Sequence, residues 1–322
     1  MTDREMEEHE MKKLIALMLA LLMAGSICFA LAEGRTPPED RKPTITELDG
    51  GNQSYLRNYQ PSFWEAPSAQ PGTIERLDYT TDVYGEPMNQ WANVYLPFGY
   101  DPAKQYNIIY FFHGTNETQE SFISVDVVKN LFDNMIELDV CEPFIMVCPT
   151  YYYDYETRAV QHQLFPDEVR NDLMPAAESK YSTYAPTADE AGFIASRDHR
   201  AFAGYSQGCM ACWNVTYRSL DYAKWHIPMS GSGVQNLEPL KDAMNNSEFK
   251  DDLFFILCCG GKRDLAYEGT VALTNAMIAD DMFSYGLNPA ENNFCTSISK
   301  EIHQTMKGRI NLYNVLIDVL FK

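Results

Sequence analysis

The chain has 322 residues, and 45 Asp and Glu residues against 25 Lys and Arg residues give it a formal net charge of −20. This charge argues against a nucleic-acid partner or an anionic membrane surface, because phosphate groups are bound by clustered cations. Hydrophobic residues make up 45% of the chain and aromatic residues 13%, which is typical of a globular protein and excludes a disordered or fibrous one. We therefore expect a folded protein that acts on a neutral or cationic partner.

Residues 1–32 carry the pattern of a secretory signal. Two lysines precede the apolar run 14–24, and small residues then lead to Ala32, after which we expect cleavage. The acidic residues 1–10 have the wrong charge for the start of such a signal, which makes Met11 an alternative start. A membrane anchor is the competing interpretation, but the apolar run is too short to span a bilayer comfortably. We expect a secreted, extracellular protein with no membrane association after signal cleavage.

Residues 33–71 are rich in proline, glycine and polar residues and show little periodicity, which predicts a mobile tether or a wrapping arm. From residue 72 the pattern is regular, and its length suits one domain, 72–322. Seven of the eight cysteines lie in this domain, and an odd number spread so widely is not a disulfide framework. Cys209 and Cys212 form a lone C-x-x-C pair, for which we favour a packing role over zinc binding or redox chemistry.

Short apolar runs alternate with helical segments along the domain. Two strands, 73–81 and 88–96, are predicted to pair around a Tyr-Gly-Glu turn. Apolar runs without alternation favour strands buried on both faces of a parallel sheet, and they cover residues 108–112, 144–148, 200–204, 226–229 and 253–259. Apolar residues at helical spacing predict helices over 128–136, 209–219, 271–283 and 310–320. This order predicts an α/β fold, a doubly wound, mostly parallel sheet opened by an N-terminal antiparallel hairpin.

Residues 204–208, Gly-Tyr-Ser-Gln-Gly, match the nucleophile elbow of α/β-hydrolases. In this motif the serine occupies a strained turn from a strand to a helix, and the flanking glycines prevent collisions with that strand and helix. A predicted strand precedes the pentapeptide and a predicted helix follows it. The start of that helix would also give Ser206 a positive local potential. We infer that Ser206 is the nucleophile, against the alternative of an ordinary turn serine.

A serine nucleophile needs a base that is neutral near pH 7, and six histidines compete for that role. The chain order in α/β-hydrolases is serine, acid, histidine. Only His303 follows Ser206 with room for an acid between them, so we infer that His303 is the base. The other histidines lie in the signal, before the serine or in an apolar strand: His9, His113, His162, His199 and His226.

The acid should follow a late strand of the sheet, and Asp264 lies in the loop that leaves the predicted strand 253–259. Its carboxylate would accept the imidazole N–H and stabilise the imidazolium. Glu268, Asp280 and Asp281 are rivals, but they fall on the following helix, where solvated side chains are the rule. A salt bridge between Asp264 and a neighbouring lysine or arginine is the other alternative.

His113, Gly114 and Thr115 directly follow the predicted strand 108–112, where hydrolases of this fold keep a turn whose backbone donates to the oxyanion. We assign the oxyanion hole to the N–H groups of Thr115 and Gln207. We expect His113 to brace the turn, and we count it and Gly114 as substrate-binding candidates.

Aromatic residues could form a slot for a planar acyl group. The stretch 150–165 is predicted to be a long loop over the carboxyl edge of the sheet. The candidates for the slot are Trp91 and three consecutive tyrosines at the start of that stretch, Tyr151, Tyr152 and Tyr153. Trp213 is a further candidate that we expect to be core.

Several segments together resemble the feruloyl esterases of carbohydrate esterase family 1, close to the esterase modules attached to bacterial xylanases. The matching segments run in the family's order over about residues 72–321: 94–101 (VYLPFGYD), 112–114 (FHG), 173–181 (LMPAAESKY), 200–208 (RAFAGYSQG) and 230–231 (SG). Two positions depart from the family pattern. Gln207 stands where the family usually has methionine, which implies an altered acyl pocket. Ile302 and Gln304 flank His303, where glycine and an aromatic residue are usual.

The resemblance implies an α/β-hydrolase fold and a serine esterase that cleaves hydroxycinnamate esters through an acyl-serine intermediate. The expected substrates are feruloylated arabinoxylan or small hydroxycinnamate esters, with no metal and no other cofactor. The resemblance also implies Ser206, Asp264 and His303 as the catalytic triad. Two alternatives stay open, an acetyl xylan esterase with the same triad and a non-catalytic carbohydrate-binding protein.

Overall fold

The computed structural model describes residues 37, 44–47, 53–57, 59–151, 158–231 and 236–322. The predicted signal, residues 1–32, lies outside these residues, as do Tyr152 and Tyr153. Within the described part of the chain, no helix has the length and apolar character that crossing a bilayer requires.

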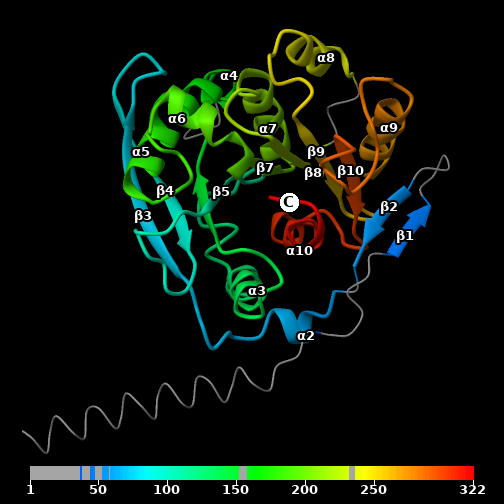
Figure 1. Ribbon diagram of the computed structural model, residues 1–322, viewed down its shortest axis with the longest axis horizontal. Helices are drawn as coiled ribbons and strands as arrows, with labels where there is room; N and C mark the ends of the chain where they lie inside the picture. The colour runs from blue at the N-terminus through cyan, green and yellow to red at the C-terminus, as the bar shows by residue number, and fades with distance from the viewer. Residues whose placement is uncertain (1–36, 38–43, 48–52, 58, 152–157, 232–235) are drawn as a thin grey trace, which may run out of the picture.

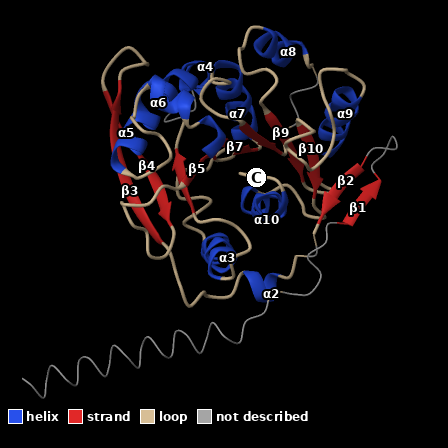
Figure 2. Cartoon of the chain, viewed as in Figure 1, coloured by secondary structure: helices blue, strands red, loops and turns tan. Residues whose placement is uncertain are grey.

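An eight-stranded sheet forms the centre of the molecule, in the order β10-β9-β8-β7-β5-β6-β4-β3 (Figures 1 and 2). The strands β3 and β4 pair antiparallel as a hairpin, and β4 also pairs antiparallel with β6, whereas all other neighbours are parallel. The predicted doubly wound, mostly parallel sheet opened by an antiparallel hairpin is therefore confirmed. The strands are β3 (Thr73–Thr81), β4 (Met88–Leu96), β5 (Asn107–Phe112), β6 (Phe144–Pro149), β7 (Arg200–Tyr205), β8 (Trp225–Met229), β9 (Phe254–Cys259) and β10 (Phe294–Ile298).

Helices cover both faces of the sheet (Figure 1). In β5, Ile109 and Phe111 pack in one apolar cluster with α3 and α10, while Ile108 and Phe112 pack in another with α4 and α5. Strands buried on both faces explain the apolar runs without alternation in the sequence. The helices are α3 (Asp126–Glu137), α4 (Arg158–Glu168), α5 (Met174–Lys180), α6 (Glu190–Ala195), α7 (Gln207–Arg218), α8 (Glu238–Asn245), α9 (Tyr267–Ile278) and α10 (Gly308–Asp318), with a π-helical turn η1 (Val169–Leu173) joining α4 to α5 and short 3₁₀ turns η2 (Arg197–His199) and η3 (Thr305–Lys307).

The described part of the N-terminal arm lies against the domain. Its two short strands, β1 (Thr44–Glu47) and β2 (Gln53–Leu56), pair antiparallel. The backbone N–H of Ile298, at the end of β10, donates to the Ser54 hydroxyl at 2.7 Å. The arm thus lies alongside the edge strand of the main sheet (Figure 1).

Further contacts fix the arm beyond β2. The guanidinium of Arg57 forms an ion pair with Asp318 of α10. Trp64, at the end of α2 (Pro61–Trp64), is buried against Tyr313 of α10, with ring centroids 5.1 Å apart. The described residues of this segment thus contact the domain, and the tether or wrapping arm over 33–71 stays a prediction.

Three local predictions are corrected. The strand β10 was not expected, because its centre is the polar pair Thr296 and Ser297; both side chains are buried and hydrogen-bonded. The expected loop over 150–165 is wrong from residue 158 onward, where α4 begins; Pro166 inside that helix hides it from the sequence pattern. The helix predicted to end at residue 283 ends at Ile278.

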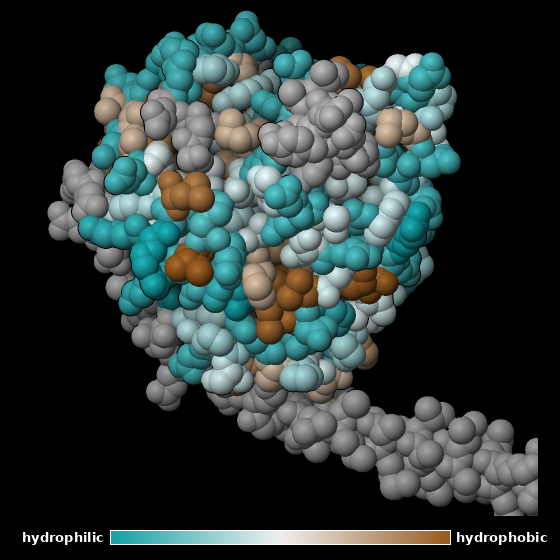
Figure 3. All heavy atoms as spheres, turned by 180° about the vertical axis from the view of Figure 1, so that it is seen from behind, coloured by the Kyte–Doolittle hydropathy of each residue, from teal (hydrophilic) through white to brown (hydrophobic). Residues whose placement is uncertain are grey.

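The surface seen from behind in Figure 3 is mostly hydrophilic and carries small, separate groups of apolar residues. The large apolar side chains that are exposed among the described residues are Phe98, Leu265, Ile278 and Ile302. Two of them, Leu265 and Ile302, are next in sequence to the predicted catalytic residues.

Candidate active site

The carboxyl ends of four parallel strands bring the predicted site residues to one edge of the sheet. Ser206 directly follows β7, Asp264 lies in the loop after β9, and His303 lies in the loop after β10. Gly114 and Thr115 follow β5, the neighbour of β7. In open α/β sheets this edge is where ligands bind.

The turn at Ser206 has the strained backbone of a nucleophile elbow. Its φ is 59° and its ψ is −115°, values that a residue with a side chain rarely adopts. A Cβ on Gly204 would lie 2.0 Å from the carbonyl oxygen of Gly208, and a Cβ on Gly208 would lie 2.0 Å from that of Phe112. Only glycine fits at either position, which explains the pentapeptide in the sequence.

Ser206, His303 and Asp264 form a continuous hydrogen-bonded chain. The Ser206 Oγ lies 2.8 Å from His303 Nε2, and His303 Nδ1 lies 2.7 Å from Asp264 Oδ1. Because a carboxylate can only accept, His303 carries its proton on Nδ1 and its Nε2 accepts from the serine hydroxyl. The Asp264 side chain is fully buried, whereas that of His303 is 20% exposed. The imidazole therefore contacts the buried Asp264 while part of its surface remains open to solvent.

The environment of Asp264 keeps its carboxyl ionised. Burial alone would raise its pKa, but hydrogen bonds from His303, from the Ala266 N–H and from the Ser230 hydroxyl hold the pKa below its usual value. The Ser230 Oγ donates to Oδ2 at 2.8 Å, and the Ala266 N–H donates to Oδ1 at 2.9 Å. The backbone N–H of Gly260 also donates to Oδ2, at 3.0 Å. Asp264 is thus an anion fixed in orientation, as a partner for an imidazolium must be.

The rival acids lie apart from this chain. Glu268 and Asp281 are exposed, and Asp280 forms an ion pair with Lys241 at 2.6 Å. None of the three has a hydrogen bond to His303 among the described contacts. A salt bridge of Asp264 to a neighbouring lysine or arginine was the other alternative, and its two carboxylate oxygens accept hydrogen bonds from His303, from Ser230 and from two backbone N–H groups.

Thr115 and Gln207 lie close together across the mouth of the site. The Thr115 hydroxyl donates to Gln207 Oε1 at 2.9 Å, and Gln207 Nε2 donates to His162 Nε2 at 2.6 Å. No described residue accepts a hydrogen bond from the backbone N–H of Thr115 or of Gln207. Both groups are therefore available to a ligand. The participation of His162, from α4, was missed because chain order excluded it as the base and gave it no other role.

His113 braces the turn below Thr115. Its Nδ1 donates to the Gly114 carbonyl at 2.9 Å, and its Nε2 accepts from the Thr150 hydroxyl at 2.8 Å. Burial lowers the pKa of His113 to about 4, so it is neutral at physiological pH. The Tyr151 hydroxyl donates to the His113 carbonyl at 2.6 Å, and the two rings stack.

A cavity of about 570 Å³ opens beside Ser206 and His303. Three of the residues that line it are apolar: Val125, Leu265 and Met306. The remaining described residues that line it are Gly114, Thr115, Glu117, Ser121, Tyr205, Gln304 and Thr305. Glu117, Ser121 and Thr305 were not predicted from the sequence, because no motif marks them.

The described aromatic candidates do not line this cavity. Tyr151 is fully buried beneath the turn, and Trp91 lies under the Arg76 guanidinium, 4.4 Å from its ring centroid. Trp213 is buried in the core, as expected.

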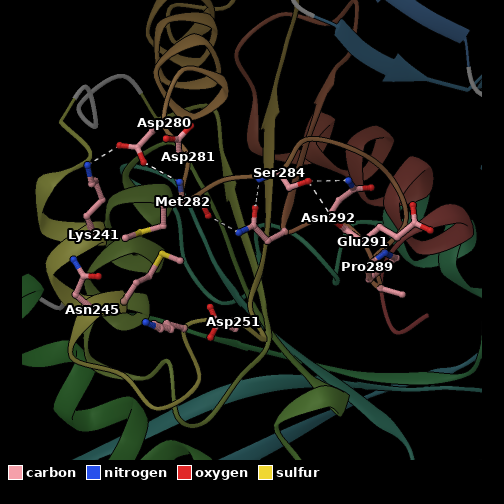
Figure 4. A pocket seen from close by; sticks show the side chains of 14 residues that line it. Lys241, Asn245, Asp251, Asp280, Asp281, Met282, Ser284, Pro289, Glu291 and Asn292 are labelled. Atoms are coloured by element: carbon pink, nitrogen blue, oxygen red, sulfur yellow. Dashed lines mark hydrogen bonds and ion pairs between the residues drawn. The ribbon is translucent and has the colours of Figure 1, made fainter.

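A second cavity of about 570 Å³ lies near the amino ends of β9 and β10, at the opposite edge of the sheet (Figure 4). Its side chains bond to one another: Lys241 pairs with Asp280, and Asn292 donates to the Ser284 hydroxyl at 3.1 Å. None of the predicted site residues contributes to it.

Among the described residues, no three His, Cys, Asp or Glu side chains group to hold a metal ion. Cys209 and Cys212 are buried free thiols, consistent with the packing role expected of them.

No family model matches the chain, but curated proteins and solved structures do. It is 35% identical over 241 residues to endo-1,4-beta-xylanase Y of Acetivibrio thermocellus, a match that covers 73% of this chain and 22% of that protein. It is 25% identical over 203 residues to an endo-1,4-beta-xylanase/feruloyl esterase of Xylanibacter ruminicola, covering 60% of this chain and 25% of that protein. The chain thus spans a quarter or less of these curated relatives.

Solved structures decide the family. A serine-to-alanine mutant of the feruloyl esterase module from Clostridium thermocellum, complexed with sinapinate, is 31% identical with a TM-score of 0.74, covering 83% of this chain and 94% of that module. The chain belongs to the feruloyl esterases of carbohydrate esterase family 1. This feruloyl esterase family consists of carboxylic ester hydrolases with the α/β-hydrolase fold. The same fold recurs in a ferulic acid esterase of Anaeromyces mucronatus, with 18% identity, a TM-score of 0.61 and coverage of 87% and 98% of the two chains.

Proposed function

We propose that this protein hydrolyses hydroxycinnamate esters, in particular feruloyl groups on arabinoxylan, through an acyl-serine intermediate. The observation that carries the proposal is the chain from Ser206 Oγ to His303 Nε2 at 2.8 Å and from His303 Nδ1 to Asp264 at 2.7 Å, beside an open cavity. Serine, histidine and carboxylate in this order are the groups that acyl transfer requires.

Acylation would begin when His303 Nε2 takes the proton of the Ser206 hydroxyl as Oγ attacks the ester carbonyl carbon. The carbonyl oxygen would become an oxyanion and accept hydrogen bonds from the N–H groups of Thr115 and Gln207. One donor of this kind is typically worth about 3 kcal/mol in the transition state. His303 would then give its proton to the leaving sugar oxygen, and the carbon–oxygen ester bond would break, leaving the acyl group on Ser206.

Deacylation would repeat these steps with water. His303 takes a proton from a water molecule, whose oxygen attacks the acyl carbon, and the collapse of the second tetrahedral intermediate returns the proton to Ser206. The products are the free hydroxycinnamic acid and the regenerated serine. Asp264 remains ionised throughout and stabilises the imidazolium in each half of the reaction.

Two further points support the choice of substrate. The relatives and structural neighbours named above include a xylanase/feruloyl esterase and a feruloyl esterase module in complex with sinapinate. The apolar residues that line the cavity, Val125, Leu265 and Met306, suit contact with an aromatic acyl group. The apolar run and small residues before Ala32 support our further proposal that the protein is secreted, where plant cell-wall polymers are accessible.

A screen of three esters tests this function. Purified protein is assayed with methyl ferulate, p-nitrophenyl acetate and acetylated xylan, and we expect release of ferulate from the first. Cleavage of acetate esters without cleavage of methyl ferulate would replace the proposal with an acetyl xylan esterase. The observation that favours an acetyl esterase is that Trp91 and Tyr151, the described candidates for an aromatic slot, do not line the cavity. Cleavage of none of the three, with binding to xylan retained, would favour a non-catalytic carbohydrate-binding protein.

A further inference from the structure

Glu117 places a carboxylate in the cavity beside Ser206, and the mechanism above gives it no role. Its Oε2 accepts a hydrogen bond from the Gly114 N–H at 2.6 Å. A Cβ built on Gly114 would lie 2.8 Å from the same oxygen, so the carboxylate packs directly on the turn. Glu117 is therefore in contact with the backbone that immediately precedes Thr115.

His113 holds the carbonyl of Gly114, and Glu117 holds its N–H, so the two hydrogen bonds act on different groups of the turn. Asn116 has a φ of 60°, in the left-handed region, and the Glu117 N–H reaches the Gly114 carbonyl only at 3.4 Å. The next N–H after that of Gly114 belongs to Thr115, the proposed oxyanion donor. Because consecutive Cα atoms are about 3.8 Å apart, the bond to Glu117 fixes a peptide unit adjacent to that donor.

The charge of Glu117 also has a consequence for ligands. Among the described residues that line the cavity, Glu117 is the one acidic residue, and none is a lysine or an arginine. An ester entering this cavity is neutral, whereas the acid that leaves is an anion at neutral pH, since carboxylic acids titrate near pH 4. Like charges in one cavity repel, so the Glu117 carboxylate disfavours the bound anion.

We propose that Glu117 is a positioning and specificity residue. Its hydrogen bond holds the turn that presents the Thr115 N–H, and its charge makes the cavity favour a neutral ester over the free carboxylate product. The product is thereby expelled, which limits inhibition by accumulated acid. This inference rests on the proposed function of the cavity and adds to it the means by which the site distinguishes substrate from product.

Binding measurements separate this inference from the function itself. In a Ser206→Ala background, which prevents turnover, the Kd values of methyl ferulate and of ferulate are measured by calorimetry at pH 7. We expect Glu117→Gln to tighten ferulate binding about fivefold relative to methyl ferulate, with a smaller effect at high salt. Glu120→Gln is the matched control, because it removes an exposed carboxylate of the same loop that does not line the cavity; its ratio should match that of the parent.

The proposed selectivity would be overturned if Glu117→Gln left the ratio of the two Kd values, ferulate to methyl ferulate, unchanged. It would also be overturned if Glu120→Gln changed that ratio by the same amount. If neither ligand binds to any variant and wild-type protein cleaves no ester, the proposed function itself fails.

Turnover of methyl ferulate tests the positioning role. Glu117→Ala removes the acceptor for the Gly114 N–H and should lower kcat about tenfold or more, with a smaller change in KM. Glu117→Gln keeps an acceptor oxygen at the same place and should recover most of that loss. The role would be contradicted if glutamine were as slow as alanine, or if alanine left kcat unchanged.

Discussion

The conformation of Ser206 is held by its neighbours. A residue with a side chain in this region of φ and ψ costs about 1–3 kcal/mol, and two backbone hydrogen bonds offset that cost. The Ser206 N–H donates to the Met229 carbonyl at 2.9 Å, and the Ser206 carbonyl accepts from the Cys209 N–H at 3.0 Å. These bonds join the end of β8 to the start of α7 through the serine, so Oγ is fixed against His303 before any ligand arrives.

The Asp264 carboxylate should matter for rate more than for binding. Asp264→Asn keeps the size of the side chain but presents an amide to His303, which favours the wrong imidazole tautomer. We expect kcat for methyl ferulate to fall about 10⁴-fold with a much smaller change in KM. Glu268→Gln is a suitable control, since that carboxylate is exposed and does not contact His303. A loss of similar size in both variants would contradict the assignment of Asp264.

Some site residues could be predicted from neighbouring residues in the sequence, and others could not. The glycines around Ser206 predict the elbow, because steric exclusion acts over only a few residues. The sequence did not predict that Trp91 and Tyr151 lie outside the cavity lining, since their places depend on where Arg76 and the turn at His113 lie in the folded chain. Glu117 gave no signal, because a loop carboxylate is ordinarily solvated.

At the scale of elements, α2 completes the core next to α10. Trp64 is 1% exposed and packs in the same apolar cluster as Tyr313. Trp64→Ala should therefore lower the free energy of unfolding by about 3–5 kcal/mol, measured by chemical denaturation. Phe98→Ala removes an aromatic side chain that is 55% exposed, and its effect should stay within about 0.5 kcal/mol. If Trp64→Ala lowered the free energy of unfolding as little as Phe98→Ala does, the arm would not belong to the cooperative unit.

Elements with a clear apolar pattern were predicted close to their observed bounds, as in β3, β4 and α3. The strand β10 was missed because hydrogen bonds, not apolar side chains, satisfy its buried centre: Asn314 donates to Ser297 at 3.1 Å. The helix α4 was missed because Pro166 interrupts its pattern. For β10, contacts with residues distant in the sequence outweigh the local preference, and a local sequence pattern does not reveal such contacts.

For the whole molecule, two buried histidines make stability depend on pH. Burial lowers the pKa of His226 to about 3 and that of His113 to about 4. Both stay neutral in the fold but gain a proton in the unfolded chain below about pH 6.5. The unfolded state then binds more protons, so stability falls as the pH drops from about 6.5 to about 4, by about 1.4 kcal/mol per pH unit for each histidine. The depressed pKa of Asp264 extends this loss to lower pH, because its contribution disappears only as the carboxylate is protonated.

The measurement is the free energy of unfolding by urea at several pH values between 5 and 7. The half-buried His199, whose pKa burial also lowers, contributes to the same slope. His226→Gln removes one of these titrating groups, so the slope of the variant against pH should be smaller than that of the wild-type protein by about 1.4 kcal/mol per pH unit toward pH 5. The comparison uses slopes, which makes it independent of any uniform loss of stability in the variant. Parallel curves for the two proteins would show that His226 does not contribute.

The decisive measurement is the rate of ferulate release from methyl ferulate by wild-type protein and by Ser206→Ala. We expect steady release by the wild type and a fall in kcat of about 10⁶-fold in the variant, with an unchanged unfolding midpoint to show that the fold is intact. Release by a folded Ser206→Ala protein at a rate near that of the wild type would contradict the proposed role of Ser206.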